Sequence, residues 1–537
     1  MNKNIKMISI IAFSVSIFSL FFACNKETDS ENSVLRQKEM EGDPVEGLTI
    51  LGDQLPNPYS IENMTTAYDS LVADSVFNIG DPSNILAPTH LYVRFLPEDS
   101  TEFNALIDDE TLALFDYPLD YEIEQRGIYY HDPTIPEDEC TWLYTVVPID
   151  YSFPTNITYQ ILDSCIIPEE NTPYYYYHDK MEEKSCWLFQ SNLMEENEQK
   201  SISKKYPEGT ISLTTTGDAP KLSYGNGVKC VKVITNNIVK IGTGYTNSYG
   251  EYYISKFYYV NKVNYSVSFE NALFFKIWAQ LNCFTPAYYN KGSHNSTGYS
   301  FNFDTNSLGW KWAAANNATF LYKMIICPYY NITQPPTYLR IWIYPMNNGW
   351  FGCAPMGRQI NMSPQLFTNY LAIASFNPTN AVRWVLPDIF VMSQSTSTCN
   401  FYGSLWHELA HASHYSSVGA SYWLNYISGI VSHTGYGDDS TGYNCGYIGV
   451  GEMWAKCFED IVGQHYLNDN YDITQPYWFK PFILTELHFD LGFTPHQIYE
   501  ALNSSSINRV SLIKEQLIAD YPNQSSTIIQ KFAYYGF

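Results

Sequence analysis

The chain has 537 residues, a hydrophobic share of 45% and a formal net charge of −25. This length and apolar content predict a folded protein of about three domains and exclude a disordered chain. Acidic residues outnumber basic ones by 55 to 30, which argues against nucleic-acid binding, because a phosphate backbone attracts clustered lysine and arginine.

Residues 1–24 have the form of a secretory signal peptide. A lysine-containing start precedes the apolar run 7–23, which ends in a small residue directly before Cys24. An uncleaved anchor helix is the alternative, because the run is almost long enough to span a bilayer. A cysteine after "FFA" resembles the signal of bacterial lipoproteins, although Phe21 stands where these usually have leucine. The resemblance implies that Cys24 is lipidated and that a lipid anchors the protein in the membrane. It also implies an outer-membrane lipoprotein of the bacterial envelope, facing the surface or the periplasm.

Residues 25–45 are polar and charged, which predicts a flexible tether between the lipid and the folded body. Ten further cysteines follow Cys24 at wide, irregular spacing and without a CxxC pair. This spacing argues against a cysteine-rich zinc site and allows one or two disulfides in an exported protein.

Residues 46–206 are predicted to form an N-terminal domain that is mostly β or α+β. Apolar and polar residues alternate in the segments 89–97, 141–154 and 157–168, as they do in strands. Turn signals such as "DPTIPEDE" separate these segments. We therefore expect at least three strands here.

Residues 207–275 contain short β-rich runs broken by glycine and asparagine, which predicts a small β-sandwich. The run "GVKCVKV" followed by "GYTNSYGEYYI" resembles the carboxypeptidase regulatory-like domain over about this whole segment. The resemblance implies an immunoglobulin-like sandwich that serves as a scaffold, and we assign it no catalytic residue.

Residues 276–537 change in character and end in a predicted helical half. Apolar residues recur with helical spacing in 451–467, 494–503 and 510–522. Thr494 is a candidate N-cap and Pro495 a candidate first helical residue. The whole chain is thus predicted to be a multidomain α+β protein with a helical rear half.

The segment "SLWHELAHASHY" (404–415) contains the pattern H-E-x-x-H. On a helix, His407 and His411 lie one turn apart on the same face and can both bind one metal ion. Glu408 lies beside them and can take a proton from a metal-bound water. The apolar residues among 405–412 support a helix with a buried face.

The third ligand must come from elsewhere in the chain. His414 shares the helix face, but three ligands from one rigid helix fit a tetrahedral ion poorly, so we expect it in the pocket wall. Glu452 begins an apolar-periodic segment and is predicted in the first turn of a second helix. Glu459, two turns further on, is the alternative ligand.

The pattern H-E-x-x-H together with "GEMWA" (451–455) resembles the gluzincins, a class of zinc metallopeptidases. The resemblance implies a zincin-like α+β peptidase domain in which His407, His411 and Glu452 bind Zn²⁺ and Glu408 is the catalytic base. It covers only these two short elements.

One departure from the thermolysin-type pattern concerns the residue four positions after the ligand glutamate. This chain has Lys456 there, where that pattern has an aspartate that orients a histidine. Glu459 or Asp460 is expected to take over this supporting role.

The sequence therefore predicts a zinc metallopeptidase that hydrolyses protein or peptide substrates of the envelope or the extracellular space. The transition state needs a further hydrogen-bond donor, and Tyr443 and His433 are the candidates, because both lie between the two ligand segments. The alternative function is that of a catalytically inactive envelope lipoprotein that binds glycan or protein.

Overall fold

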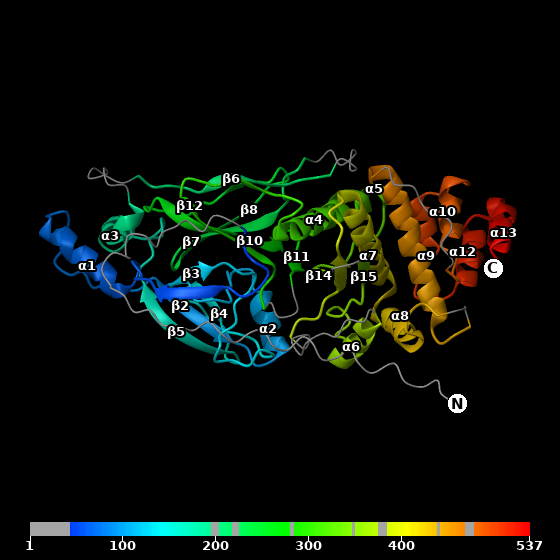
Figure 1. The fold of residues 1–537 in the computed structure, drawn as a ribbon, viewed down its shortest axis with the longest axis horizontal. Coiled ribbons are helices and arrows are strands. Elements are labelled where there is room, and N and C mark those ends of the chain that lie inside the picture. Colours follow the sequence, from blue (N-terminus) through cyan, green and yellow to red (C-terminus); the bar gives the residue numbers. More distant parts are fainter. Residues whose placement is uncertain are drawn as a thin grey trace, which may run out of the picture. The chain divides into compact units, whose positions relative to one another are not determined.

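The computed structural model describes residues 43–194, 203–216, 225–279, 284–345, 350–373, 384–437, 441–467 and 477–537 (Figure 1). The predicted signal peptide, Cys24 and nearly all of the tether lie outside these residues. The described part combines helices with several β-sheets, which confirms the predicted α+β class. Among the described helices, none has both the length and the apolar character that a membrane crossing requires.

The N-terminal part is built around a three-stranded antiparallel sheet. Its central strand β2 (His90–Leu96) pairs with β4 (Leu143–Pro148) on one side and β5 (Thr158–Cys165) on the other. All three strands fall within the segments where alternation predicts strands, so that prediction is confirmed. A ribbon of β1 (Ile50–Gln54) and β3 (Tyr121–Gln125) and the helices α1 (Ile61–Ala73), α2 (Ser100–Ile107) and α3 (Tyr175–Phe189) complete this part.

Strand β2 contributes side chains to apolar clusters on both of its faces. Successive side chains of a strand point to opposite sides, so neighbouring residues enter different clusters. Leu91, Val93 and Phe95 pack into the large core that extends through the rest of the described chain. Tyr92, between them, packs into a second cluster with Tyr144 and other aromatic residues. The sheet thus separates two apolar cores.

The largest sheet has eight strands, seven of them in the order β15–β16–β14–β11–β10–β7–β8, with β12 paired to β10. Its strands are β7 (Val231–Asn237), β8 (Lys240–Tyr245), β10 (Lys262–Asn271), β11 (Phe275–Trp278), β12 (Tyr288–Asn295), β14 (Leu339–Pro345), β15 (Trp350–Cys353) and β16 (Ile389–Ser393). β11, β14 and β16 are parallel, whereas β15 is antiparallel to β16. Parallel neighbours need long crossovers, and α4 (Leu308–Leu321) and α6 (Pro364–Ala372) lie within them.

A smaller sheet of β6 (Glu208–Leu213), β9 (Glu251–Tyr253) and β13 (Phe301–Phe303) packs against the large one, and both contribute to one core. Two sheets do face each other, as the predicted sandwich requires. However, β12 and β13 lie beyond residue 275, and β10 continues through β11 into the parallel strands. The segment 207–275 is therefore not a closed sandwich of its own, because its strands pair with strands from outside it.

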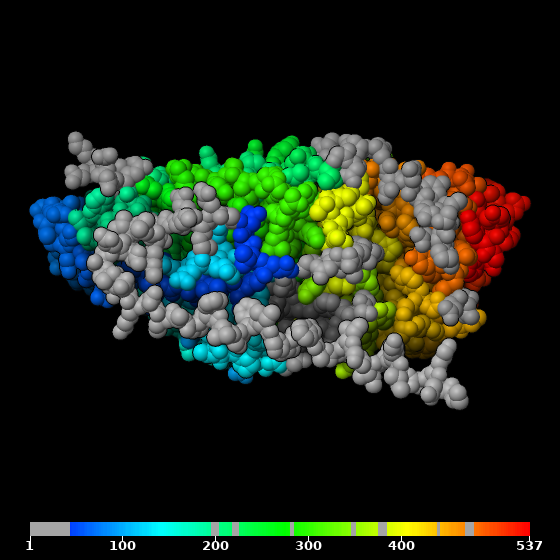
Figure 2. Space-filling model, viewed as in Figure 1, coloured from blue at the N-terminus to red at the C-terminus, as the bar shows by residue number. Residues whose placement is uncertain are grey.

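The rear half is helical, as predicted. It contains α7 (Thr398–Val418), α8 (Ala420–His433), α9 (Cys445–Val462), α10 (Phe482–Phe489), α11 (Pro495–Glu500), α12 (Val510–Asp520) and α13 (Ser525–Tyr534). In Figure 2 the visible surface of this half is coloured from yellow to red. Thr494 caps α11 in a reciprocal capping box with Gln497, and Pro495 is the first helical residue, which confirms both predicted roles.

Helix α7 is fixed between two neighbouring helices by tryptophan hydrogen bonds. The indole N–H of Trp406 donates to the carbonyl of Ala318 in α4 at 3.0 Å. The indole N–H of Trp454 in α9 donates to the carbonyl of Ala410 at 3.1 Å. Both rings are fully buried, so these bonds set the position of α7 relative to α4 and α9.

Candidate metal centre

Helix α7 carries the H-E-x-x-H residues near its middle. Ser397 caps its N-terminus by accepting a hydrogen bond from the backbone of Asn400, and Gly419 ends it at a φ of 82°. Leu405, Leu409 and Ala412 are completely buried, as the expected apolar face requires. The histidine-bearing turn is therefore part of a rigid core helix.

Helix α9 supplies Glu452. The helix begins at Cys445, so Glu452 lies in its third turn and not in the first, where the sequence pattern placed it. Glycines precede Glu452, and a Cβ on Gly451 would lie 3.1 Å from the ring of Tyr426. The missing side chain lets α9 approach α8 closely at the level of Glu452.

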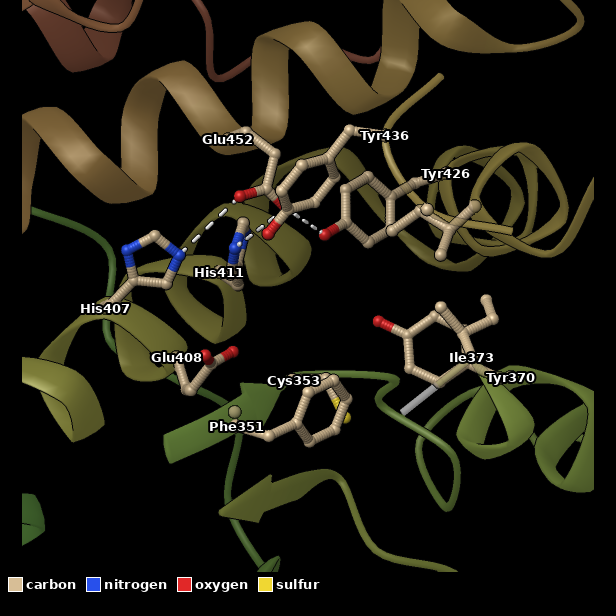
Figure 3. Close-up of a pocket in the computed structure, with 13 residues that line it drawn as sticks. Phe351, Cys353, Tyr370, Ile373, His407, Glu408, His411, Tyr426, Tyr436 and Glu452 are labelled. Carbon is tan, nitrogen blue, oxygen red and sulfur yellow. Dashed lines mark hydrogen bonds and ion pairs between the residues drawn. The ribbon is translucent and has the colours of Figure 1, made fainter. Parts of the chain in front are cut away.

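The side chains of His407, His411 and Glu452 converge in one small region (Figure 3). Nε2 of His407 lies 3.7 Å from one carboxylate oxygen of Glu452, and Nε2 of His411 lies 3.5 Å from the other. One ligand atom from each residue can be chosen so that all three lie within 4.8 Å of one another. In the part of the chain that the structure describes, no other group of three His, Cys, Asp or Glu residues meets this condition.

Glu459 contacts the His407 ring on the side opposite Glu452. Its carboxylate oxygen lies 3.0 Å from Nδ1 of His407, the ring nitrogen that faces away from Glu452. The structure thus places Glu459 beside the first ligand and not among the three converging ligand atoms. Lys456 stands four residues after Glu452, where the thermolysin-type pattern has an aspartate. Its Nζ forms ion pairs with Glu459 at 3.3 Å and with Asp460 at 2.7 Å.

The protonation states of His411 and Glu452 suit metal binding, whereas burial of His407 is outweighed by the carboxylates of Glu452 and Glu459, which raise its pKa above its ordinary value, so this ring must release a proton when a metal binds. Burial lowers the pKa of His411 to about 3, which keeps its imidazole neutral. Burial opposes ionisation of Glu452, but His411, His407 and the hydroxyl of Tyr426 outweigh it and hold the Glu452 pKa below its ordinary value. A neutral imidazole and an ionised carboxylate are the forms that bind a metal.

Glu408 lies in the same cavity but does not point at Glu452 (Figure 3). It is 2% exposed, and its Oε2 has no hydrogen-bond partner among the described residues. Burial raises the pKa of Glu408 to about 8, and the charges of Glu452 and Glu459 add to this against the opposing effect of His407. A buried carboxyl with a free oxygen and a raised pKa can hold a proton near neutral pH.

The cavity has a volume of about 230 Å³ and is walled by aromatic residues from three regions. Tyr426 of α8 donates a hydrogen bond to Oε1 of Glu452 at 2.5 Å. Tyr370 of α6 directs its hydroxyl into the cavity, and Phe351 of β15 forms the opposite wall (Figure 3). Tyr436 also lines the cavity, and the charge of Glu452 followed by burial raises its pKa well above the ordinary value.

Three residues considered from the sequence lie outside this cavity. His433 ends α8, is partly exposed and interacts through Nε2 with the carbonyl of Tyr443 at 3.0 Å. Tyr443 is 62% exposed, and neither residue is among those that line the cavity, so the structure does not bring these two candidate donors to the converging side chains. His414 is buried, with Nε2 3.2 Å from the carbonyl of Leu502, and is neither a ligand nor a wall residue.

Of the residues that the sequence did not single out, Tyr426 and Tyr370 matter most. Tyr426 belongs to α8, which carries none of the three converging side chains, and lies seven residues before His433 in the chain. Its position on α8 places its hydroxyl against Glu452. Tyr370 and Phe351 come from a region more than 30 residues before the histidine motif. No sequence pattern marks them, because tyrosine occurs 46 times in this chain.

The donor set fits zinc. Two imidazole nitrogens and one carboxylate oxygen are a ligand set of catalytic zinc sites, which leave a fourth position open. Two ligands bound tetrahedrally at zinc distances are about 3.4 Å apart. The separations of 3.5 and 3.7 Å between the histidine nitrogens and Glu452 lie close to that value.

Comparisons with known proteins add no relative from which a role could be carried over. Protein-family models, curated proteins and solved structures contain no match to this chain. The chemistry of the centre therefore has to be argued from the residues and distances described above.

Proposed function

We propose that this protein is a zinc-dependent metallopeptidase of the gluzincin type. The observation that carries the proposal is the convergence of His407, His411 and Glu452 beside Glu408 in one buried cavity. Binding alone would require only the ligands, whereas a carboxyl with an unpartnered oxygen next to them suits proton transfer. The signal-like N-terminus leads us to propose in addition that Cys24 anchors the enzyme to the bacterial envelope.

When bound, zinc supplies a Lewis acid that lowers the pKa of a water molecule to about 7. In this scheme Glu408 accepts the proton of the attacking water at Oε2, the oxygen without a partner. The same carboxyl then delivers the proton to the leaving nitrogen of the peptide bond. The positive charge of a bound zinc ion would favour the ionised form of Glu408, which is the form that can accept this proton.

The cavity wall suggests how the reacting carbonyl is stabilised. The hydroxyl of Tyr370 points into the cavity, and burial raises its pKa well above the ordinary value, so it stays protonated as a donor. A neutral donor aimed at a developing negative charge in a buried site typically contributes a few kcal/mol to catalysis. We assign this role to Tyr370, with Tyr436 as the second donor on the wall.

We assign a peptide as the substrate, because the edge strand beside the cavity can pair with an extended chain. β15 is the terminal strand of the sheet among the described residues, and Phe351, Gly352 and Cys353 line the cavity. The exposed edge of a strand offers backbone donors and acceptors to another extended chain. A substrate bound along β15 would place its backbone against the metal centre.

The test is a pair of measurements on the purified chain and on Glu408→Gln. We expect about one zinc per chain in both proteins by elemental analysis, and cleavage of casein or a peptide library by the wild type alone. Loss of the base should reduce turnover by about 10²- to 10⁴-fold. Glu515→Gln, which alters an exposed glutamate of α12, serves as the matched control.

Two results would contradict the proposal. A wild-type chain that binds no zinc has no metal centre, and a Glu408→Gln variant that cleaves as fast as the wild type has a different base. Zinc binding without cleavage across broad libraries would favour the alternative, an inactive envelope lipoprotein that binds glycan or protein.

A further inference from the structure

The N-terminal part contains a second cavity, of about 710 Å³. Its wall is formed by β1 and the segment after it, by β2, β4 and β5, and by residues 118–132. It shares no residue with the cavity of the metal centre. Its volume falls within the range of roughly 300–1,000 Å³ that ligand sites occupy.

Two acids on this wall are held in place by amide side chains. Nε2 of Gln54 donates to Asp120 at 2.6 Å, and Nδ2 of Asn57 donates to Asp163 at 2.8 Å. The hydroxyl of Tyr92 also donates to Asp120, at 3.1 Å. These bonds fix the carboxylates before a ligand arrives, and each carboxylate keeps lone pairs for further donors.

The single cation of the wall is fixed as well. The guanidinium of Arg94 stacks over the ring of Trp142 at 4.1 Å and donates to Gln160 and to the hydroxyl of Tyr144. A guanidinium has five N–H donors, and the three hydrogen bonds named here leave others for a ligand. Arg94 is therefore a rigid donor on the wall.

Two tyrosines are available to a ligand. Tyr121 and Tyr130 line the cavity and are partly exposed, and no hydroxyl partner is found for either among the residues that the structure describes. Burial and the charge of Asp132 raise the pKa of Tyr130 to about 12, so its hydroxyl remains protonated and can donate. Each ring also offers a flat apolar face.

The charges of the wall exclude two ligand classes. Asp120, Asp132 and Asp163 face one Arg94, so an anion would be repelled. The three acids do not form a group close enough to hold one metal ion in the described part of the chain. The wall offers acceptors in its carboxylates and donors in its amides, guanidinium and tyrosines, which matches a hydroxyl group, at once donor and acceptor.

We propose that this second cavity binds a neutral carbohydrate. Asp120 and Asp163 would accept hydrogen bonds from sugar hydroxyls, Arg94 would donate to them, and the rings of Tyr121 and Tyr130 would contact the C–H faces of the sugar. An ammonium group could use the carboxylates but not the donors, so a lysine side chain by itself satisfies the wall less well. The assignment is independent of the metal centre.

The test probes the full chain against an array of neutral gluco-, manno-, xylo-, galacto- and N-acetylglucosamine oligosaccharides. Acidic glycans and oligolysine on the same array represent the excluded classes. We expect selective binding of at least one neutral oligosaccharide, which calorimetry then quantifies. Asp163→Asn and Tyr130→Ala should weaken that binding at least tenfold, whereas Glu408→Gln should leave it unchanged.

Unfolding of a variant is separated from loss of binding by its thermal midpoint. Gln54→Ala, which changes an exposed side chain, replaces any variant whose midpoint falls by more than a few degrees. Binding of no neutral oligosaccharide, preference for an acidic glycan or oligolysine, or unchanged affinity in correctly folded cavity variants would each overturn the proposal.

Discussion

The carboxylate of Glu459 lies 3.0 Å from Nδ1 of His407, while Nε2 of the same ring faces Glu452. Burial alone would lower the pKa of His407, but the carboxylates of Glu452 and Glu459 outweigh it and raise the pKa well above the ordinary value. An acid on the far nitrogen fixes the ring orientation and makes the near nitrogen a better metal ligand.

Glu459→Gln should therefore weaken zinc binding without removing a ligand. Loss of such a supporting acid typically costs about 10- to 100-fold in metal affinity. Zinc affinity, measured by competition with a chromogenic chelator at pH 7, should fall in this range, and Glu515→Gln should bind as the wild type does. An unchanged affinity in Glu459→Gln would show that this contact does not support the ligand.

Tyr426 supports the third ligand in a similar way, because its hydroxyl donates to Glu452 at 2.5 Å. Tyr426→Phe keeps the ring, which stacks on Trp423 with centroids 4.7 Å apart, and removes only the hydrogen bond. We expect zinc affinity to fall by about 10- to 100-fold, since a hydrogen bond to a charged group contributes about 1.5–3 kcal/mol.

Tyr422→Phe is the matched control for Tyr426→Phe. It lies on the same helix, and its hydroxyl donates to the carbonyl of Ile507 at 3.0 Å, away from the metal centre. This variant should lose stability but not zinc affinity. Equal losses of zinc affinity in the two variants would mean that Tyr426 acts through the packing of α8 and not through Glu452.

Local signals predicted much of the fold, and non-local pairing explains the rest. The cap at Thr494 and the strands β2, β4 and β5 follow from residue type and spacing within a few positions. The pairing of β11 with β14 joins residues more than 60 positions apart. No short pattern encodes such a pairing, so the boundary expected at residue 275 falls within a continuous sheet.

The same distinction applies to the site. The spacing of His407 and His411 is enough to predict that they share a helix face. Glu452 is predictable because it is an acid in a second apolar-periodic segment. Sequence alone indicates His433 and Tyr443, because they lie between the ligand segments in the chain. The orientation of α8 about its own axis points Tyr426, and not His433, toward Glu452. This orientation depends on how the helices pack, which sequence spacing does not determine.

Removal of one partner of a buried ion pair outside the site should destabilise the N-terminal part. Nζ of Lys240 in β8 lies 2.6 and 2.7 Å from the carboxylate oxygens of Glu182 in α3, and both side chains are 0% exposed. Glu182→Gln leaves the ammonium buried without its counter-ion, which costs about 3–5 kcal/mol. Chemical denaturation of the two proteins measures this difference.

The control for Glu182→Gln is its neighbour in sequence. Glu183 pairs with Lys180 at 2.8 Å, and the Lys180 side chain is 35% exposed, so Glu183→Gln should cost less than about 1 kcal/mol. Zinc binding should be unchanged in both variants. A similar small loss in Glu182→Gln would mean that the buried pair is replaceable by neutral hydrogen bonds.

Asp116 should make the protein less stable as the pH rises. The side chain is buried, accepts a hydrogen bond from the backbone of Tyr130 at 2.7 Å, and has a pKa raised by burial from 3.8 to about 7. Between these two values the folded chain holds a proton that the unfolded chain releases, so the free energy of unfolding falls with rising pH. The full effect of this one group is about 4 kcal/mol, reached above pH 7.

The variant Asp116→Asn cannot ionise, so it should gain stability relative to the wild type between pH 4 and 8, as measured by urea denaturation. The control Asp520→Asn changes an exposed aspartate and should show no such gain. A difference between Asp116→Asn and the wild type that stays constant over this range would show that Asp116 ionises equally easily in both states.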